Sequence, residues 1–166
     1  NDLFGTKRYA SHAKHKYLDM SGWRTLCEAM KASSTITNFS AADVDMNPEA
    51  VALLANAIKF MAAVARLSLR GNLITGSDPS NKRNREFDKD LSGLISLCDA
   101  LLTLKNPIEL DLSECGLSVN GVNPVAKAIS TGAALNSIAL DGCTITGTTF
   151  GTGYGEHQGG NHEKIE

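Results

Sequence analysis

The chain has 166 residues, of which 42% are hydrophobic and 20% charged, and its formal net charge is −2. This length is sufficient to bury a hydrophobic core without help from disulfides or metals. The near-neutral charge gives no general reason to expect nucleic acid as a partner, and every apolar stretch is shorter than the roughly 18 residues that a membrane-spanning helix needs. We therefore predict a protein that binds neither nucleic acid nor a membrane.

The N-terminal part predicts a basic surface followed by a helix. Residues 7–16 are rich in Lys and Arg and contain His12 and His15, which we expect to be solvated. After them, apolar residues recur at the three- and four-residue spacing of a helix face. These are Trp23, Leu26, Cys27, Ala29 and Met30.

A spaced apolar motif then occurs four times. One clear copy reads Val64-x-x-Leu67-x-Leu69-x-x-Asn72-x-Ile74, and the alternation at its centre is typical of a half-buried strand. The copies begin at Ile36, Val64, Pro107 and Leu135, at steps of 28, 43 and 28 residues. The recurrence predicts a solenoid, in which each unit buries its apolar face against its neighbours.

Each of the first three motifs is followed by a second apolar pattern at helical spacing. Counted from the strand start at Ile36 and Pro107, and at the equivalent positions counted back from Pro107 in the unit with the longer step, the sixteenth, nineteenth, twentieth, twenty-second and twenty-third positions are apolar, and the twentieth and twenty-second are small. Small residues let a helix lie close to the strand layer. We expect Pro48 and Pro124 in the first turns of their helices. The columns are Val51, Leu54, Ala55, Ala57, Ile58; Leu94, Leu97, Cys98, Ala100, Leu101; and Val122, Val125, Ala126, Ala128, Ile129.

The step of 43 residues localises an insertion to about residues 75–90. The segment is mostly small, polar or charged, so we expect a solvated loop on one rim of the solenoid. It is either a binding element or an insertion without a role.

The two halves of the pattern together resemble a leucine-rich repeat protein of the ribonuclease-inhibitor type. The resemblance implies an α/β fold: a short leucine-rich-repeat solenoid, or horseshoe, with a parallel concave β-sheet and convex α-helices. It implies about five units within residues 1–146, and a Gly-rich polar tail at 147–166 follows them. In this family the ninth residue of each motif turns inward and satisfies backbone groups, which implies that role for Asn72, Cys115 and Cys143.

The repeat pattern explains the positions of the four cysteines better than a catalytic or metal-binding role does. Cys27 and Cys98 occupy the small helix column, and Cys115 and Cys143 occupy the ninth position, so we predict four structural, reduced thiols. His157 and His162 lie in the tail without a nucleophile or carboxylate at a recognisable spacing. We predict no enzyme activity, no cofactor, no metal and a cytoplasmic location.

The residues that point away from the helices would line the concave face. We predict that a partner binds there, at Arg66, Ser68, Arg70, Glu109, Asp111 and Asp141. An equally weighted alternative is that Arg66 and Arg70 merely neutralise Glu109 and Asp111 on a solvated surface.

The predicted function is a non-catalytic protein-protein interaction module or scaffold, which binds a protein partner through the concave face and the repeat loops. The alternative is a regulator of a small GTPase, because proteins that activate the GTPase Ran use the same repeat type. A homodimer through an exposed end repeat is a further prediction, since end strands that lack a cover pair with other chains.

Overall fold

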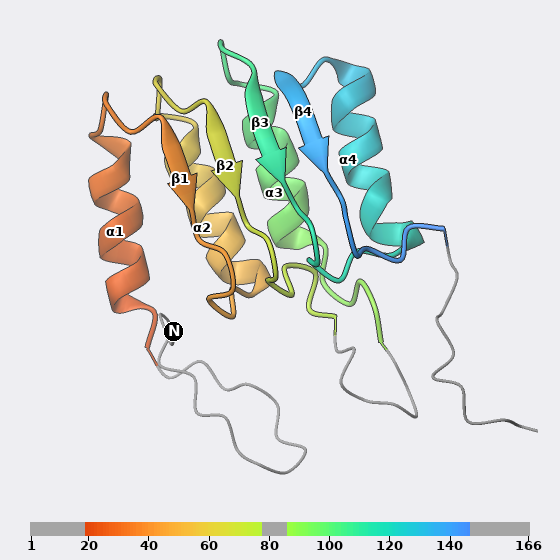
Figure 1. Cartoon of the computed structure of the whole chain (residues 1–166). Coiled ribbons are helices and arrows are strands. Elements are labelled where there is room, and N and C mark those ends of the chain that lie inside the picture. Colours follow the sequence, from red (N-terminus) through yellow and green to blue (C-terminus); the bar gives the residue numbers. More distant parts are fainter. Residues whose placement is uncertain (1–18, 78–85, 147–166) are drawn as a thin grey trace, which may run out of the picture.

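A computed structural model of the chain describes residues 19–77 and 86–146, which form an α/β fold of alternating helices and strands. The four strands lie side by side in one open parallel sheet, in the order β1-β2-β3-β4. The helices form a second layer behind this sheet (Figure 1). The elements are α1 (Ser21–Lys31), β1 (Asn38–Ser40), α2 (Pro48–Ile58), β2 (Arg66–Ser68), α3 (Ser92–Leu101), β3 (Ile108–Asp111), α4 (Val119–Thr131) and β4 (Leu135–Ala139).

The strands pair at equivalent positions of the repeated motif. Phe39 lies opposite Leu67, Leu67 opposite Leu110, and Leu110 opposite Ile138. All four are the fourth residue of their motif, so the sequence period predicted the register correctly. The strands on either side of the insertion, β2 and β3, pair in this same register.

The core lies between the sheet and the helices. Leu67 and Leu110 from the strands meet Leu54 and Leu97 from the helices, and all four are at most 3% exposed. Full burial of such a side chain contributes about 1.5–3 kcal/mol. The predicted columns of α2 and α3 are therefore confirmed as core.

In the two end helices, α1 and α4, some of the residues predicted to be core are exposed. Leu26 in α1 is 40% exposed and Ile129 in α4 is 49% exposed, whereas Ile58 and Leu101, in the same column as Ile129, are 1% exposed. Each inner helix has a described helix on both sides, but α1 and α4 each have one on a single side. The apolar helix positions therefore predict which residues are able to join the core. Whether such a residue is buried depends on a neighbouring helix that covers it.

The two prolines take different positions. Pro48 is the first residue of α2, where Asn47 caps the helix by accepting a hydrogen bond from the Ala50 N–H over 2.8 Å. Pro124 lies inside α4 and not in its first turn, so that prediction was wrong. Because proline has no N–H, it cannot donate to the carbonyl of Asn120, four residues earlier.

Each strand is followed by a turn whose eighth motif residue has left-handed backbone. These residues are Asp43, Gly71, Glu114 and Gly142, with φ between 54° and 71°. A β-carbon on Gly71 would collide with the carboxylate of Asp43, and one on Gly142 would lie 2.9 Å from Cγ of Glu114. Acidic residues and glycines therefore alternate from turn to turn, and each acidic side chain leans over the next glycine.

The flanks of the insertion are built into the fold, which corrects the expectation of a solvated loop for these residues. Thr75 is fully buried and Ser77 is 4% exposed. The Ser77 hydroxyl donates to the Gly116 carbonyl (2.8 Å) and accepts from the Asp88 N–H (3.0 Å). Asp88 then accepts hydrogen bonds at the start of α4, from the N–H and hydroxyl of Ser118 and the N–H of Gly121. The insertion is thus anchored at both ends to the following unit.

Several predictions fall on residues outside the described ranges. These are the basic stretch with His12 and His15, the centre of the insertion at 78–85, and the tail with His157 and His162. Among the helices of residues 19–77 and 86–146, none combines the length and apolarity that spanning a membrane would take.

Candidate protein-binding face

The sheet face opposite the helices, here called the open face, carries most of the predicted binding residues. Arg66 and Ser68 are the first and last residues of β2, and Glu109 and Asp111 lie on β3. The register places Arg66 beside Glu109 and Ser68 beside Asp111. Strand alternation therefore brings these four side chains together, as the sequence predicted.

Two ion pairs cross between neighbouring units on this face. Arg66 donates to Oε2 of Glu109 from Nε at 2.7 Å and from a terminal nitrogen at 2.6 Å. Arg70, in the turn after β2, donates to Oε1 of Glu114 over 2.5 Å. All four side chains are about half exposed, at 46–60%. Exposed pairs of this kind stabilise a fold by only about 0–1 kcal/mol each, so they leave the charges available to a partner.

Arg70 pairs with Glu114 and not with Asp111, which corrects the predicted pairing. Asp111 instead accepts a hydrogen bond from the Ser68 hydroxyl (2.9 Å) and one from the Ser113 N–H (3.0 Å). Its partial burial opposes ionisation, but the bonds from Ser113 and Ser68 and the nearby charge of Arg70 outweigh this and lower its pKa. The hydrogen bond and charge of Glu114 raise the pKa of Arg70 above its usual value. Both groups are therefore ionised at neutral pH.

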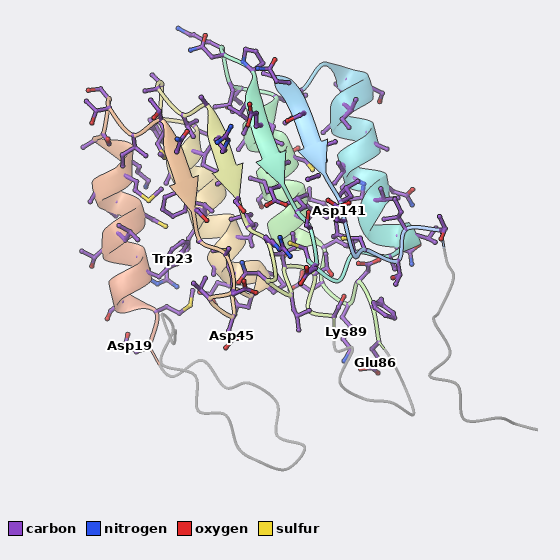
Figure 2. All side chains as sticks on the ribbon, viewed as in Figure 1. Asp19, Trp23, Asp45, Glu86, Lys89 and Asp141 are labelled. Carbon is purple, nitrogen blue, oxygen red and sulfur yellow. The ribbon has the colours of Figure 1, made fainter. Side chains whose placement is uncertain are left out.

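Asp141 lies in the turn that follows β4 (Figure 2) and takes part in neither of these two ion pairs. Its backbone carbonyl accepts a hydrogen bond from the Glu114 N–H over 2.7 Å, which ties the last two turns together. Its exposed position places a carboxylate at the end of the open face. Four of the six predicted residues therefore form two cross-strand pairs, Arg66 with Glu109 and Ser68 with Asp111, while Arg70 pairs with Glu114 and Asp141 joins none of these pairs.

Glu114 is the residue of this face that sequence reasoning missed. The inward–outward alternation of strand residues could not predict its position, because it is the eighth motif residue and lies in the turn after the strand. Its backbone is left-handed (φ 57°), and its carboxylate accepts a hydrogen bond from Arg70 in the preceding turn. The signal in the sequence that could have found it is the alternation of acidic residues and glycines at the eighth motif position.

The ninth motif residues hold the turns beneath this face. Asn72 accepts hydrogen bonds from the N–H groups of Val44 (3.1 Å) and Met46 (2.9 Å), and donates to the carbonyls of Ala41 and Leu69 (2.7 Å each). It thereby satisfies buried backbone groups of two units, as the resemblance implied.

Two cysteines take over part of this role in the next units. The thiol of Cys115 donates to the Leu69 carbonyl (3.2 Å), and that of Cys143 to the Leu112 carbonyl (3.4 Å). Burial raises the pKa of Cys115 to about 12 and those of Cys27 and Cys98 to about 11. All four cysteines are free thiols, and these three are protonated at neutral pH, which fits a structural role.

The described residues contain no group of three or more His, Cys, Asp or Glu side chains that could hold a metal ion. What the open face offers is a row of charged and hydroxyl side chains on a four-stranded parallel sheet. Such a surface can form hydrogen bonds and ion pairs with another macromolecule.

Comparison with known proteins adds information about the fold. No protein-family model matches the chain, and no curated protein matches it. A solved structure described as "Leiomodin-1 Actin-Binding Site 2 (ABS2)" is similar over 71% of this chain, with a TM-score of 0.51 and 16% sequence identity. The chain covers 61% of that structure's chain. At this identity the likeness supports the fold alone, a small α/β fold of the leucine-rich-repeat kind.

Proposed function

We propose that this chain is a non-catalytic protein-interaction module whose open face and adjoining turns bind a protein partner. The observation that carries this proposal is the pair of exposed inter-unit ion pairs, Arg66 with Glu109 and Arg70 with Glu114, on a sheet face that no described helix covers. We further propose that the units belong to a solenoid of the ribonuclease-inhibitor type, with this face concave, and that the protein acts in the cytoplasm.

The chemistry of the face favours a broad, polar contact. Each arginine is already oriented by a carboxylate, so a partner carboxylate can join the same guanidinium without the side chain first becoming ordered. Ser68, between Arg66 and Arg70 in the chain, and Ser137, beside Glu109, add hydroxyl groups to the face. No aromatic residue lies among the described open-face positions of β2, β3 and β4, so we expect affinity to be spread over many contacts and not concentrated in one aromatic anchor.

The test begins with a photoreactive amino acid at Ser137 on the open face, and at Asn56 on the outer side of α2 as the matched control. Both positions are exposed. Crosslinking mass spectrometry in extract from the native source then identifies partners captured from Ser137 and not from Asn56. The proposal fails if both positions capture the same proteins.

A purified partner permits the quantitative test. The double variant Arg66→Glu and Arg70→Glu should reduce affinity at least about tenfold, since carboxylates would then replace the two guanidinium groups that a partner carboxylate joins. Lys59→Glu, on the exposed end of α2, changes charge away from the face and should leave affinity unchanged. Equal affinities of the double variant and the parent chain would exclude the open face as the binding surface.

Actin is one protein to test directly, because the similar solved structure is an actin-binding site. Co-sedimentation of the purified chain with actin filaments, and inhibition of pyrene-actin polymerisation, cover both forms of actin. If the Arg66→Glu and Arg70→Glu double variant bound actin as well as the parent chain does, actin would bind at another surface.

The small-GTPase regulator remains the alternative function. It rests on the resemblance of the repeat type to activators of Ran. A measured acceleration of GTP hydrolysis by a purified GTPase would favour it, and unchanged hydrolysis would leave the scaffold proposal.

A homodimer through the end of the sheet is a further part of the proposal. The last unit is less well covered than the two inner units: Leu67 and Leu110 are at most 3% exposed, whereas Ile138, in the same motif position, is half-buried. Light scattering over a range of concentrations tests it, and a strict monomer would exclude the dimer.

A further inference from the structure

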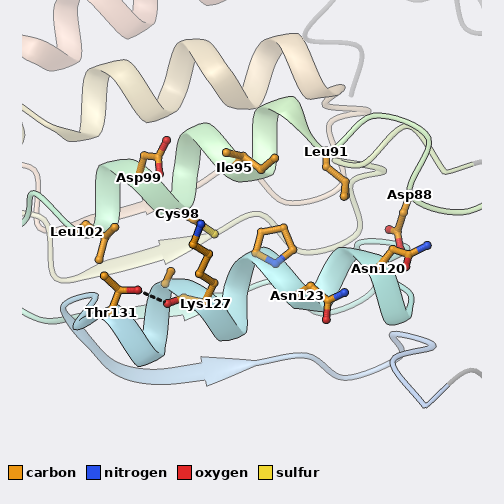
Figure 3. Close-up of a pocket in the computed structure, with 12 residues that line it drawn as sticks. Asp88, Leu91, Ile95, Cys98, Asp99, Leu102, Asn120, Asn123, Lys127 and Thr131 are labelled. Carbon is orange, nitrogen blue, oxygen red and sulfur yellow. Dashed lines mark hydrogen bonds between the residues drawn. The ribbon is translucent and has the colours of Figure 1, made fainter.

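The layer of helices contains a groove between α3 and α4, on the opposite side of the molecule from the open face. The groove has a volume of about 700 Å³. Its α3 side is apolar, with Leu91, Ile95, Cys98 and Leu102, and its α4 side contributes Pro124 and Ala128 among polar neighbours. Figure 3 shows the two helices side by side, with these side chains between them.

The apolar residues of α3 form a second stripe in addition to its core stripe. Leu94, Leu97 and Leu101 face the core and are at most 1% exposed. On the groove side Ile95 is 45% exposed and Leu102 is 40% exposed. A helix that is apolar on two sides, one of them exposed, is one that a further element can cover.

The repeat shows that this stripe is not required by the fold. The position of Ile95 in its unit is occupied by Arg24, Ala52 and Asn123 in the other three units. The position of Leu102 is occupied by Lys31, Lys59 and Ser130. Large apolar residues at both positions occur in one unit of the four, the unit that also carries the insertion.

The spacing of the stripe identifies the shape of its partner. Leu91, Ile95, Cys98 and Leu102 follow one another at four, three and four residues, which is the heptad spacing along which one helix packs into another. An extended peptide alternates with a period of two and would not follow this ridge. The stripe spans 12 residues from Leu91 to Leu102, or about 16 Å at the rise of a helix, which corresponds to three turns of a partner.

The charges at the rim define the partner further. Asp99 lies on the α3 side and Lys127 on the α4 side. Among the described residues neither side chain has an ion-pair partner, although Arg24, Lys31, Arg66 and Arg70 all do. One free anion and one free cation on opposite walls complement a helix with a basic and an acidic flank.

We propose that this groove binds an amphipathic α-helix of a protein partner, which lies along α3 and α4 with its apolar stripe on Ile95 and Leu102. One flank of the helix supplies a cation to Asp99 and the other supplies an anion to Lys127. The chain's own residues 147–166 fit less well. Phe150 and Tyr154 have a four-residue spacing there, but the next heptad positions, His157 and Asn161, are polar.

The test uses the full chain and a fluorescein-labelled synthetic peptide of about 18 residues, with Leu at the heptad core positions, Lys along one flank and Glu along the other. Binding is measured by fluorescence anisotropy. A companion peptide with a central proline cannot form the helix. We expect the helical peptide to bind and the proline peptide to lose at least about tenfold in affinity. Equal binding of the two peptides, or no binding of the helical one, overturns the proposal.

The matched variant replaces the stripe with residues that other units already carry. Ile95→Asn and Leu102→Lys introduce the residues found at those positions as Asn123 and Lys59, so the fold should tolerate them. This double variant should lose at least about tenfold in peptide affinity. Phe60→Ser, at a 63% exposed residue outside the groove, is the control and should retain it. Unchanged binding by the stripe variant refutes the groove as the site, provided that its circular dichroism matches the parent.

A helix with one basic and one acidic flank can bind in either direction along the groove, so that either flank can face either wall. The charge prediction is therefore tested in a way that does not depend on the direction of the helix. Asp99→Lys makes both walls basic, so this variant should prefer a peptide with two Glu flanks. Lys127→Glu should prefer two Lys flanks, and the parent chain should prefer mixed flanks. The same preference in all three proteins would overturn the charge assignment.

Amide chemical shifts separate this proposal from that for the open face. Peptide-induced changes should concentrate on α3 and α4. Changes confined to β2 and β3 would contradict the groove while supporting binding at the open face. A groove that takes an apolar dye but no helical peptide would be a small-ligand site, and the proposal would fail.

Discussion

Asp88 accepts a hydrogen bond from the backbone N–H of Gly121 over 2.7 Å, across 33 residues of chain. The first N–H groups of a helix lack intrahelical partners, and Ser118 at the start of α4 makes no capping bond to this helix itself. Asp88, near the end of the insertion, serves as the cap in its place. A residue that belongs to no motif position thus fixes the start of the next helix.

Asp88→Ala should therefore destabilise the fold. Loss of an N-terminal cap costs about 1–2 kcal/mol, and here the N–H groups of Ser118 and Gly121 both lose their acceptor. Urea unfolding followed by circular dichroism measures the change. Asp99→Ala removes a carboxylate without such bonds and should stay within about 0.5 kcal/mol. Equal stabilities of the two variants would show that the cap has no energetic role.

Gly93→Ala should be destabilising because of a close approach between helices. A β-carbon at this position would collide with the backbone carbonyl of Pro48 in α2, and backbone cannot move aside cheaply. We expect a loss of about 1–3 kcal/mol, as for other overpacked sites. Gly22 occupies the equivalent position of α1 with nothing within 4 Å. There the same substitution should stabilise by about 0.5–1 kcal/mol, so opposite signs in thermal unfolding are the expected result.

Asn72→Cys tests whether the two residue types at the ninth position are interchangeable. A thiol can donate to a carbonyl, as Cys115 does to Leu69, but it is a poor acceptor for the N–H groups of Val44 and Met46. Each buried N–H left without a partner costs about 1–3 kcal/mol. We therefore expect Asn72→Cys to destabilise nearly as much as Asn72→Ala, and both more than Cys115→Ala. A cysteine variant as stable as the parent would refute this account.

Asp111 should make stability depend on acid pH. Its folded-state pKa is lowered, so its contribution is present above the ordinary value of 3.8 and is lost as pH falls through the lower folded-state value. Ser68→Ala removes one of the hydrogen bonds and should raise this pKa toward 3.8. Carbon-detected NMR titration of the carboxyl group reads the pKa directly. The same titration curve in both proteins would contradict the assigned role of Ser68.

The sequence predicted the repeated part of this fold well. The period alone placed Phe39, Leu67, Leu110 and Ile138 in register, and the ninth position assigned Asn72 to the backbone of the turn. These features recur at a fixed interval because every inner unit meets the same neighbour in the same way. A pattern that must satisfy the same packing several times is visible in one sequence.

Only the tertiary structure decided the features in which one unit differs from another. Arg70 pairs with Glu114 of the next turn, Asp88 caps a helix 30 residues later, and Ile129 is exposed where Leu101 is buried. Each depends on which residue of another segment lies within a few ångströms, and periodicity carries no information about that. The sequence by itself therefore determined the strands, the helices and the residues able to form a core. The three-dimensional arrangement determined which charges pair, which ends remain open and where the helices separate into a groove.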